Sequence, residues 1–143
     1  MTAHRILEIV SSSAAMFALC AMAGSFTVVA AGPLDGKVFV GEAGEKGKPA
    51  DEKNDIITFA DGKFHSSACD QWGFNKAEYT ARTEGDATVF EAETVSDKEG
   101  RLKWKGTLKG GVIEGAFVHL RKPAWYRPNP EPIEHWFKAV PKS

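Results

Sequence analysis

Residues 88–120, TVFEAETVSDKEGRLKWKGTLKGGVIEGAFVHL, decide the fold. Apolar and polar residues alternate through most of this stretch, which is typical of β-strands that bury one face. A turn at 97–99, followed by Gly100 in the left-handed conformation, sets the register of the first two strands. In that register glutamates face lysines across the hairpin, as Glu93–Lys103 and Glu91–Lys105. The opposite face of the same hairpin is apolar and carries Phe90, Ala92, Leu102, Trp104 and Leu108.

A second hairpin is predicted at Gly110-Gly111, a dipeptide that favours a tight two-residue turn. This turn pairs apolar residues across the strands, as Leu108–Ile113 and Trp104–Phe117. It also places two glycines opposite each other, where a curved sheet can bend sharply: Gly106 and Gly115. The same register turns His119 toward the face that carries Trp104, near the end of its strand.

The rest of the chain after residue 31 reads as further short strands and turns. Asp61-Gly62 supplies the positive φ angles of a two-residue turn, with Phe59 opposite Phe64, Ile57 opposite Ser66 and Thr58 opposite His65. Other segments are interpreted in the same way: strands at 36–43, 77–83 and 133–140, a turn or short helix at 70–79, and a charged, mobile loop at 45–55. Four prolines exclude a central strand from 121–132.

These elements predict an all-β fold without a long helix. We expect an antiparallel up-and-down meander of about eight short strands in sequential hairpins. Such meanders end as a closed barrel or as a sandwich, because open sheet edges are prone to aggregation. We predict a closed or nearly closed barrel, whose interior at eight strands holds side chains or one small ligand.

Residues 1–31 are expected to be a signal peptide, which leaves one domain at 32–143. The segment has an uncharged, alanine-rich apolar centre, and small residues fit a cleavage site after Ala31 or, alternatively, after Ala23. We therefore expect an exported protein, periplasmic or secreted, that has no membrane contact after cleavage. The alternative is an uncleaved membrane anchor, since the uncharged run is long enough to span a bilayer.

The composition argues against a partner that is recognised by charge. The chain has 18 Lys and Arg and 19 Asp and Glu, with a net charge of −1 at pH 7, whereas nucleic-acid-binding domains are usually basic. The sequence contains no phosphate-binding loop, nucleophile elbow, zinc-protease helix or dinucleotide fingerprint. We therefore expect a binding protein rather than an enzyme, with no nucleic-acid partner and no cofactor.

Cys69 is the one cysteine left after cleavage at residue 31, so it cannot form an intramolecular disulfide. We interpret it as a buried thiol, with a reactive thiol or a disulfide-linked dimer as alternatives. His65 lies four residues earlier, but four residues of strand span about 13 Å. The two side chains can share a metal ion only if the chain bends at Ala68 or sooner, so no metal site is expected here.

The layout resembles that of the small calycin-like, or lipocalin-like, secreted barrels. The resemblance is carried by a glycine-containing first strand (LDGKVFVGEAG, 34–44), a chain of short hairpins, and a closing aromatic strand (EHWFKAV, 134–140). It covers most of the chain after residue 31. The resemblance implies a ligand-binding cup and no catalytic residues.

The candidate ligand contacts are inward-facing aromatic and histidine side chains, together with an aromatic pair in the proline-rich segment. If Phe137 points inward, His135 does too, and it then lies near His119 at one mouth of the barrel. The aromatic pair at 125–126 suits a lid over that mouth. The predicted ligand-binding residues are Phe90, Trp104, Phe117, His119, Trp125, Tyr126 and His135.

We predict that the barrel binds a small, largely apolar ligand without catalysis. An anionic ligand is also considered, because the proline-rich segment carries Arg121, Lys122 and Arg127. The first alternative is a protein-interaction or inhibitor module with a solid core, which makes contact through the proline-rich segment and residues 43–54. The second is a metal-binding, haem-binding or thiol-redox protein built on His119, His135, or His65 with Cys69.

Overall fold

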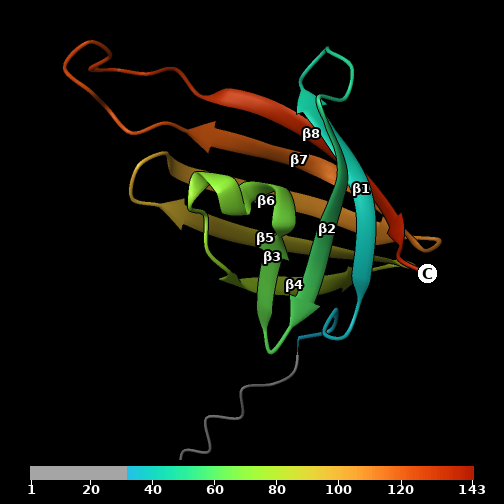
Figure 1. The fold of residues 1–143 in the computed structure, drawn as a ribbon. Helices are drawn as coiled ribbons and strands as arrows, with labels where there is room; N and C mark the ends of the chain where they lie inside the picture. Colours follow the sequence, from blue (N-terminus) through green and yellow to red (C-terminus); the bar gives the residue numbers. More distant parts are fainter. Residues whose placement is uncertain (1–31) are drawn as a thin grey trace, which may run out of the picture.

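The computed structural model describes residues 32–143, and these form a closed barrel of eight antiparallel strands (Figure 1). Neighbours in the sequence are neighbours in the barrel, and β8 closes it by pairing with β1. The strands are β1 Val38–Glu45, β2 Glu52–Ala60, β3 Lys63–Ser66, β4 Ala77–Glu84, β5 Ala87–Ser96, β6 Gly100–Lys109, β7 Val112–Leu120 and β8 Ile133–Pro141. A short 3₁₀-helix, η1 (Ser67–Trp72), follows β3. The all-β, up-and-down prediction is confirmed, whereas the predicted signal peptide lies outside the described residues.

Within residues 32–143, no helix is both long enough and apolar enough to cross a membrane.

The predicted hairpin registers are present in the structure. Asp61 and Gly62 have φ angles of 53° and 72°, and they pair Phe59 with Phe64. Across β5 and β6, glutamates stand opposite lysines as expected, at Glu93–Lys103 and Glu91–Lys105. The ion pairs differ in one respect: Glu91 contacts Lys105 at 3.8 Å, but Glu93 takes Arg101, at 3.0 Å. The register therefore follows from the alternation of apolar and polar residues. On the solvent-exposed face, a charged side chain can pair either with the residue directly opposite or with a diagonal neighbour.

One end of the barrel is packed solid with aromatic rings. Phe59 is fully buried, and its ring centroid lies 5.0 Å from that of Tyr79, 5.1 Å from Phe90 and 5.5 Å from Phe64. The turn before β1 covers this end with Leu34, which is 1% exposed. The Leu34 backbone N–H donates to the Tyr79 hydroxyl (3.1 Å), which in turn donates to the Asp35 carboxylate (2.7 Å). Apolar packing and satisfied polar groups together close this end to water.

The expectation of a charged loop over 45–55 is wrong in extent. The loop comprises only residues 46–51, because β1 continues to Glu45 and β2 already begins at Glu52. A β-bulge between Gly41 and Glu42 accommodates the extra residue, with Asn54 at a φ angle of 65°. Charged side chains on the outside of the barrel point into solvent and leave the backbone free to form strand hydrogen bonds. The charged composition of this segment therefore did not exclude a strand.

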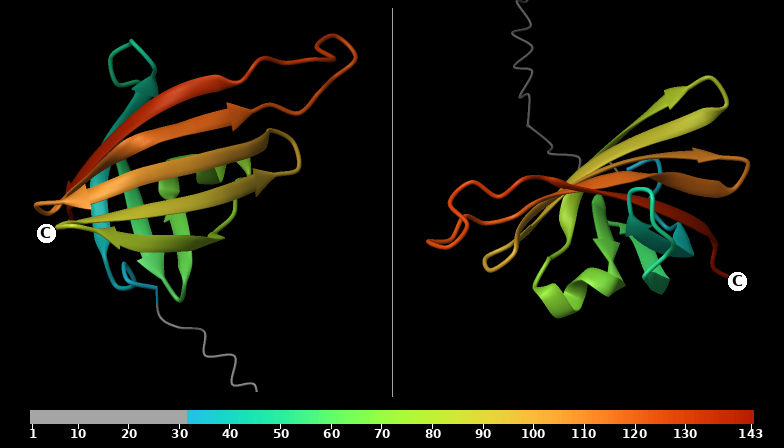
Figure 2. Two further views of the ribbon diagram at one scale, coloured as in Figure 1. Left: turned by 180° about the vertical axis from the view of Figure 1, so that it is seen from behind. Right: turned by 90° about the horizontal axis from the view of Figure 1, so that it is seen from above.

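The connection between β7 and β8 extends away from the barrel (Figures 1 and 2). A single antiparallel bridge, between Ala124 and Arg127, makes its tip. Trp125 is 92% exposed and Tyr126 is 65% exposed, with their ring centroids 5.5 Å apart. The two rings therefore do not cover the barrel end, and the lid interpretation is wrong for this structure. A stretch with four prolines lacks the N–H donors that would tie it to the sheet.

Candidate functional site

The end of the barrel opposite Leu34 contains a cavity of about 440 Å³. Its walls come from β1, β2, β3, β6, β7 and β8, and η1 together with Phe74 forms one side. Aromatic side chains make up much of the lining: Trp72, Phe74, Trp104 and Phe117. Trp104 joins the two halves of the barrel, because its ring contacts Phe64 in the packed half (4.8 Å) and stacks on Phe117 at the cavity (4.2 Å). The interior is therefore a cup with a solid base and an open upper half.

Asp55 is the most buried charged residue of the cup, at 5% exposure. Its carboxylate accepts hydrogen bonds from the Ser66 hydroxyl (2.6 Å), the Ser67 hydroxyl (3.2 Å) and the Ala68 backbone N–H (3.0 Å). These bonds tie the start of η1 to β2 and hold the chain where it leaves β3. Sequence reasoning missed this residue. The signal was present, because the alternation that turns Ile57 and Phe59 inward also turns Asp55 inward.

His119 and His135 both line the cup. His119 stands opposite Leu102, as the Gly110-Gly111 register predicts, and its Nε2 lies 2.8 Å from the Glu99 carbonyl oxygen. Since a carbonyl only accepts, Nε2 carries the proton and donates. The His135 ring stacks on Phe117, at 4.6 Å with an interplanar angle of 3°. Burial lowers the pKa of His135.

Cys69, on η1, is free and also lines the cup. Burial, reinforced by the nearby carboxylates of Asp55 and Asp70, raises the pKa of its thiol to about 11. The group is therefore a protonated thiol at neutral pH, which is a weak nucleophile. Reactivity of Cys69 and a disulfide-linked dimer remain predictions, and comparing the native mass with and without reductant tests the dimer.

The chain does bend early after His65, because η1 begins at Ser67, but the bend gives His65 a different partner. Its Nε2 lies 2.6 Å from the Asp70 carboxylate, outside the cup. Within the described residues 32–143, no group of three or more His, Cys, Asp or Glu side chains is arranged to hold a metal ion.

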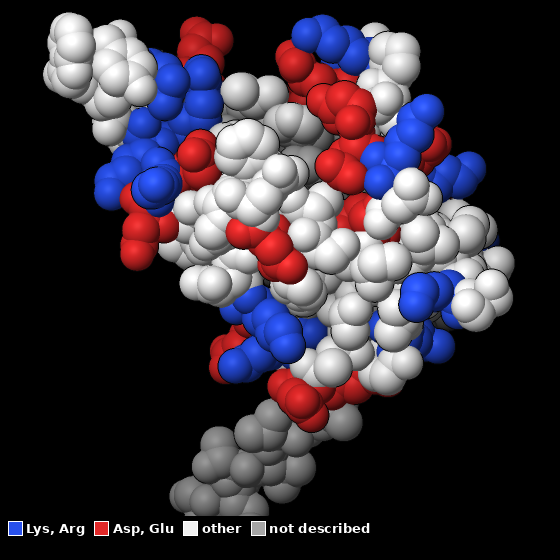
Figure 3. All heavy atoms as spheres, in the orientation of Figure 1, with Lys and Arg blue, Asp and Glu red and all other residues white. Residues whose placement is uncertain are grey.

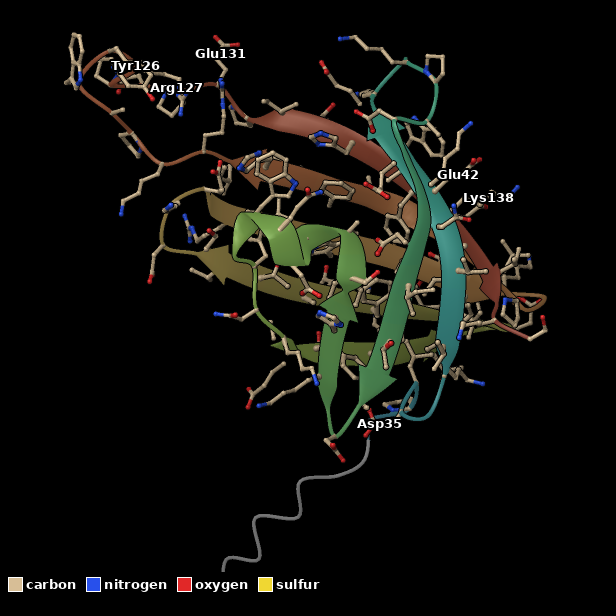
Figure 4. All side chains as sticks on the ribbon, viewed as in Figure 1. Asp35, Glu42, Tyr126, Arg127, Glu131 and Lys138 are labelled. Atoms are coloured by element: carbon tan, nitrogen blue, oxygen red, sulfur yellow. The ribbon has the colours of Figure 1, made fainter. Side chains whose placement is uncertain are left out.

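The structure separates the predicted binding residues into two sets. Four of them line the cup: Trp104, Phe117, His119 and His135. The other three lie elsewhere. Phe90 is fully buried in the packed half and stacks on Phe64 at 5.4 Å, and Trp125 and Tyr126 are on the extended β7–β8 loop, where Figure 4 labels Tyr126. Sequence reasoning also missed Trp72 and Phe74 as lining residues, since no periodicity fixes directions in and after a short 3₁₀-helix.

Comparison with protein-family models, with curated proteins and with solved structures found no match to this chain. The closed eight-stranded antiparallel barrel is consistent with the calycin-like layout that the sequence resembles. In chemical terms the cup offers flat apolar walls, two histidines, one neutral thiol and several carboxylates, and this set is suited to holding a small molecule.

Proposed function

We propose that this chain is an exported, non-catalytic β-barrel that binds a small, largely apolar ligand in its open half. The observation that carries the proposal is the cavity of about 440 Å³ above a solid aromatic base. Small-molecule sites typically measure about 300–1,000 Å³ and combine apolar walls with a few polar groups that set orientation. A barrel that needed only stability would gain by filling this volume with side chains.

The polar groups of the cup support binding rather than catalysis. The Cys69 thiol is protonated at neutral pH, the His119 ring is held by a backbone carbonyl, and the Asp55 carboxylate holds η1 in place. A catalytic nucleophile needs an adjacent base that activates it. The resemblance to calycin-like barrels, whose cups bind ligands, points in the same direction, and export follows from the predicted signal peptide at 1–31.

The first test measures binding to the cup with the uncharged, environment-sensitive dye N-phenyl-1-naphthylamine. Ala43 is 7% exposed and lines the cup, so Ala43→Leu should fill part of the cavity and weaken dye binding at least about fivefold. The control is Ala116→Leu, which adds the same atoms to an exposed position on β7. Equal dye affinity in both variants and in the unmodified protein would refute binding in the cup.

A second candidate function is a protein-interaction module, favoured by the exposure of Trp125 (92%) and Tyr126 (65%). Exposed aromatic side chains are frequent anchors of protein interfaces. The same protein, purified from its native cells and extracted with organic solvent, distinguishes the two functions. Ligand binding in the cup is supported if small molecules are extracted from the unmodified protein but not from Ala43→Leu. The interaction function is supported if a protein co-purifies with the unmodified chain but not with Trp125→Ala.

A further inference from the structure

We infer that the cup selects ligands that carry a positive charge on a flat apolar body, such as aromatic amines, and discriminates against anions. This inference rests on the proposed function and names its ligand class. Four acidic residues contribute to the lining of the cup: Asp51, Glu52, Asp55 and Glu99. Among residues 32–143, no Lys or Arg lines it.

The carboxylates of these four residues form no ion pair with any residue of the described part of the chain. Acids elsewhere on the barrel do form ion pairs, such as Glu134 with Lys46 and Glu93 with Arg101. Asp55 is nearly buried, and its hydrogen-bond donors are two hydroxyls and one backbone N–H, all uncharged. A buried anion that is solvated by neutral dipoles alone still attracts a mobile cation.

Two further titratable groups of the cup, His135 and Cys69, do not offset this charge. Burial lowers the pKa of His135, which favours its neutral form, and the Cys69 thiol is protonated at neutral pH. The carboxylates of Asp55, Asp70 and Glu52 each raise the pKa of Cys69, which is the effect of a negative potential at that atom. Figure 3 shows that acidic side chains, interspersed with basic ones, gather beside the β1–β2 loop, while basic side chains gather toward the β7–β8 loop.

The aromatic walls favour the same ligand class. The Trp104–Phe117–His135 stack presents ring systems to the cup, and Trp72, 55% exposed, adds an indole at the side formed by η1. An ammonium group over an aromatic face gains cation–π attraction, and this gain grows as water is excluded. Flat apolar ligands stack on the same rings, so an aromatic amine uses both features at once.

The experiment compares three probes that share one bicyclic skeleton and differ in charge: 2-naphthylmethylamine, 2-naphthylmethanol and 2-naphthoate. Binding is measured by calorimetry at pH 7 and fixed ionic strength. We expect the amine to bind about tenfold tighter than the alcohol, and the carboxylate to bind weakest. Raising the salt concentration should narrow the gap between amine and alcohol.

Variants that remove one negative charge test which carboxylates produce the preference for the amine. Glu52→Gln and Asp55→Asn should each reduce the ratio of the amine affinity to the alcohol affinity about threefold or more. The control is Glu114→Gln, an exposed acid on the outside of β7. If Asp55→Asn fails to fold, Glu52→Gln and the salt dependence decide the question.

The failure of this inference is distinguishable from failure of the proposed function. If the amine and the alcohol bind equally, or the carboxylate binds tightest, the inferred preference for positive charge is wrong. The cup remains the binding site in that case if Ala43→Leu still weakens binding of the probes. If none of the three probes binds and the dye test also fails, the proposed function falls and the inference falls with it.

Discussion

The division of the barrel into a solid base and an open cup predicts different costs for two truncations of the same residue type. In the base, Phe59 is fully buried and its ring contacts the rings of Phe39, Phe64, Tyr79 and Phe90. Phe59→Ala therefore leaves an enclosed void that closely packed neighbours cannot fill. We expect it to lower the free energy of unfolding by about 3–5 kcal/mol.

The matched truncation in the cup is Phe117→Ala. Phe117 is 9% exposed, stacks on Trp104 and His135, and borders a cavity that already exists. Its removal enlarges an open space instead of creating a closed one, so the loss should be roughly 2–3 kcal/mol. The two variants should thus differ by about 1–2 kcal/mol although they delete the same atoms.

Urea denaturation followed by circular dichroism measures both values, and an unchanged slope against urea confirms that the comparison concerns stability. Affinity for 2-naphthylmethylamine supplies an independent readout, because Phe117→Ala should weaken it while Phe59→Ala, where folded, should not. If Phe117→Ala costs as much as Phe59→Ala, or leaves the affinity unchanged, the division into base and cup is wrong.

Three further predictions concern single residues. The Cys69 thiol, with its pKa raised to about 11, should react with a disulfide reagent at pH 8 at least about tenfold more slowly than the same thiol in urea; equal rates would show that it is accessible and ionised. The pKa of His135 is lowered from its ordinary value of 6.5, so the unfolded state binds the proton more tightly and stability should fall as the pH drops below about 6.5. His135→Gln should flatten that fall in pH-dependent urea titrations, and an unaltered pH profile would contradict the assignment. Gly115→Ala would place a Cβ 2.1 Å from the Lys105 carbonyl oxygen, so it should lower stability by more than about 1 kcal/mol, whereas an unchanged melting temperature would mean that β6 and β7 can separate there.

Much of the fold followed from the sequence because the residues specified three hairpins, and one of these was specified by two independent signals. Across β5 and β6, the pairing of glutamates with lysines and the pairing of apolar residues require one register, and Gly100 fits the turn that produces it. Asp61-Gly62 and Gly110-Gly111 fix two more hairpins through positive φ angles. A shift by one residue would exchange the faces of a strand, so these local signals propagate around the barrel.

The candidate site was only partly predictable, because its walls depend on segments without a regular period. His119 was placed correctly by strand alternation from a glycine turn, whereas Trp72 and Phe74 take their directions from η1 and the residues after it. Asp55 was missed although alternation pointed it inward, because a charged residue beside a charged loop suggests solvent exposure. Trp125 and Tyr126 were assigned to the mouth of the barrel because aromatic composition says nothing about where a proline-rich loop extends.

The most direct test of the central claim is a magnetic resonance titration of isotope-labelled protein with 2-naphthylmethylamine. The claim is that the small molecule binds inside the cup, so the aromatic and backbone signals of Trp104, Phe117, His119 and His135 should shift together and saturate with one dissociation constant. Signals of Trp125 and Tyr126 should stay in place. Shifts confined to Trp125 and Tyr126, with the signals of the cup unmoved, would contradict the account.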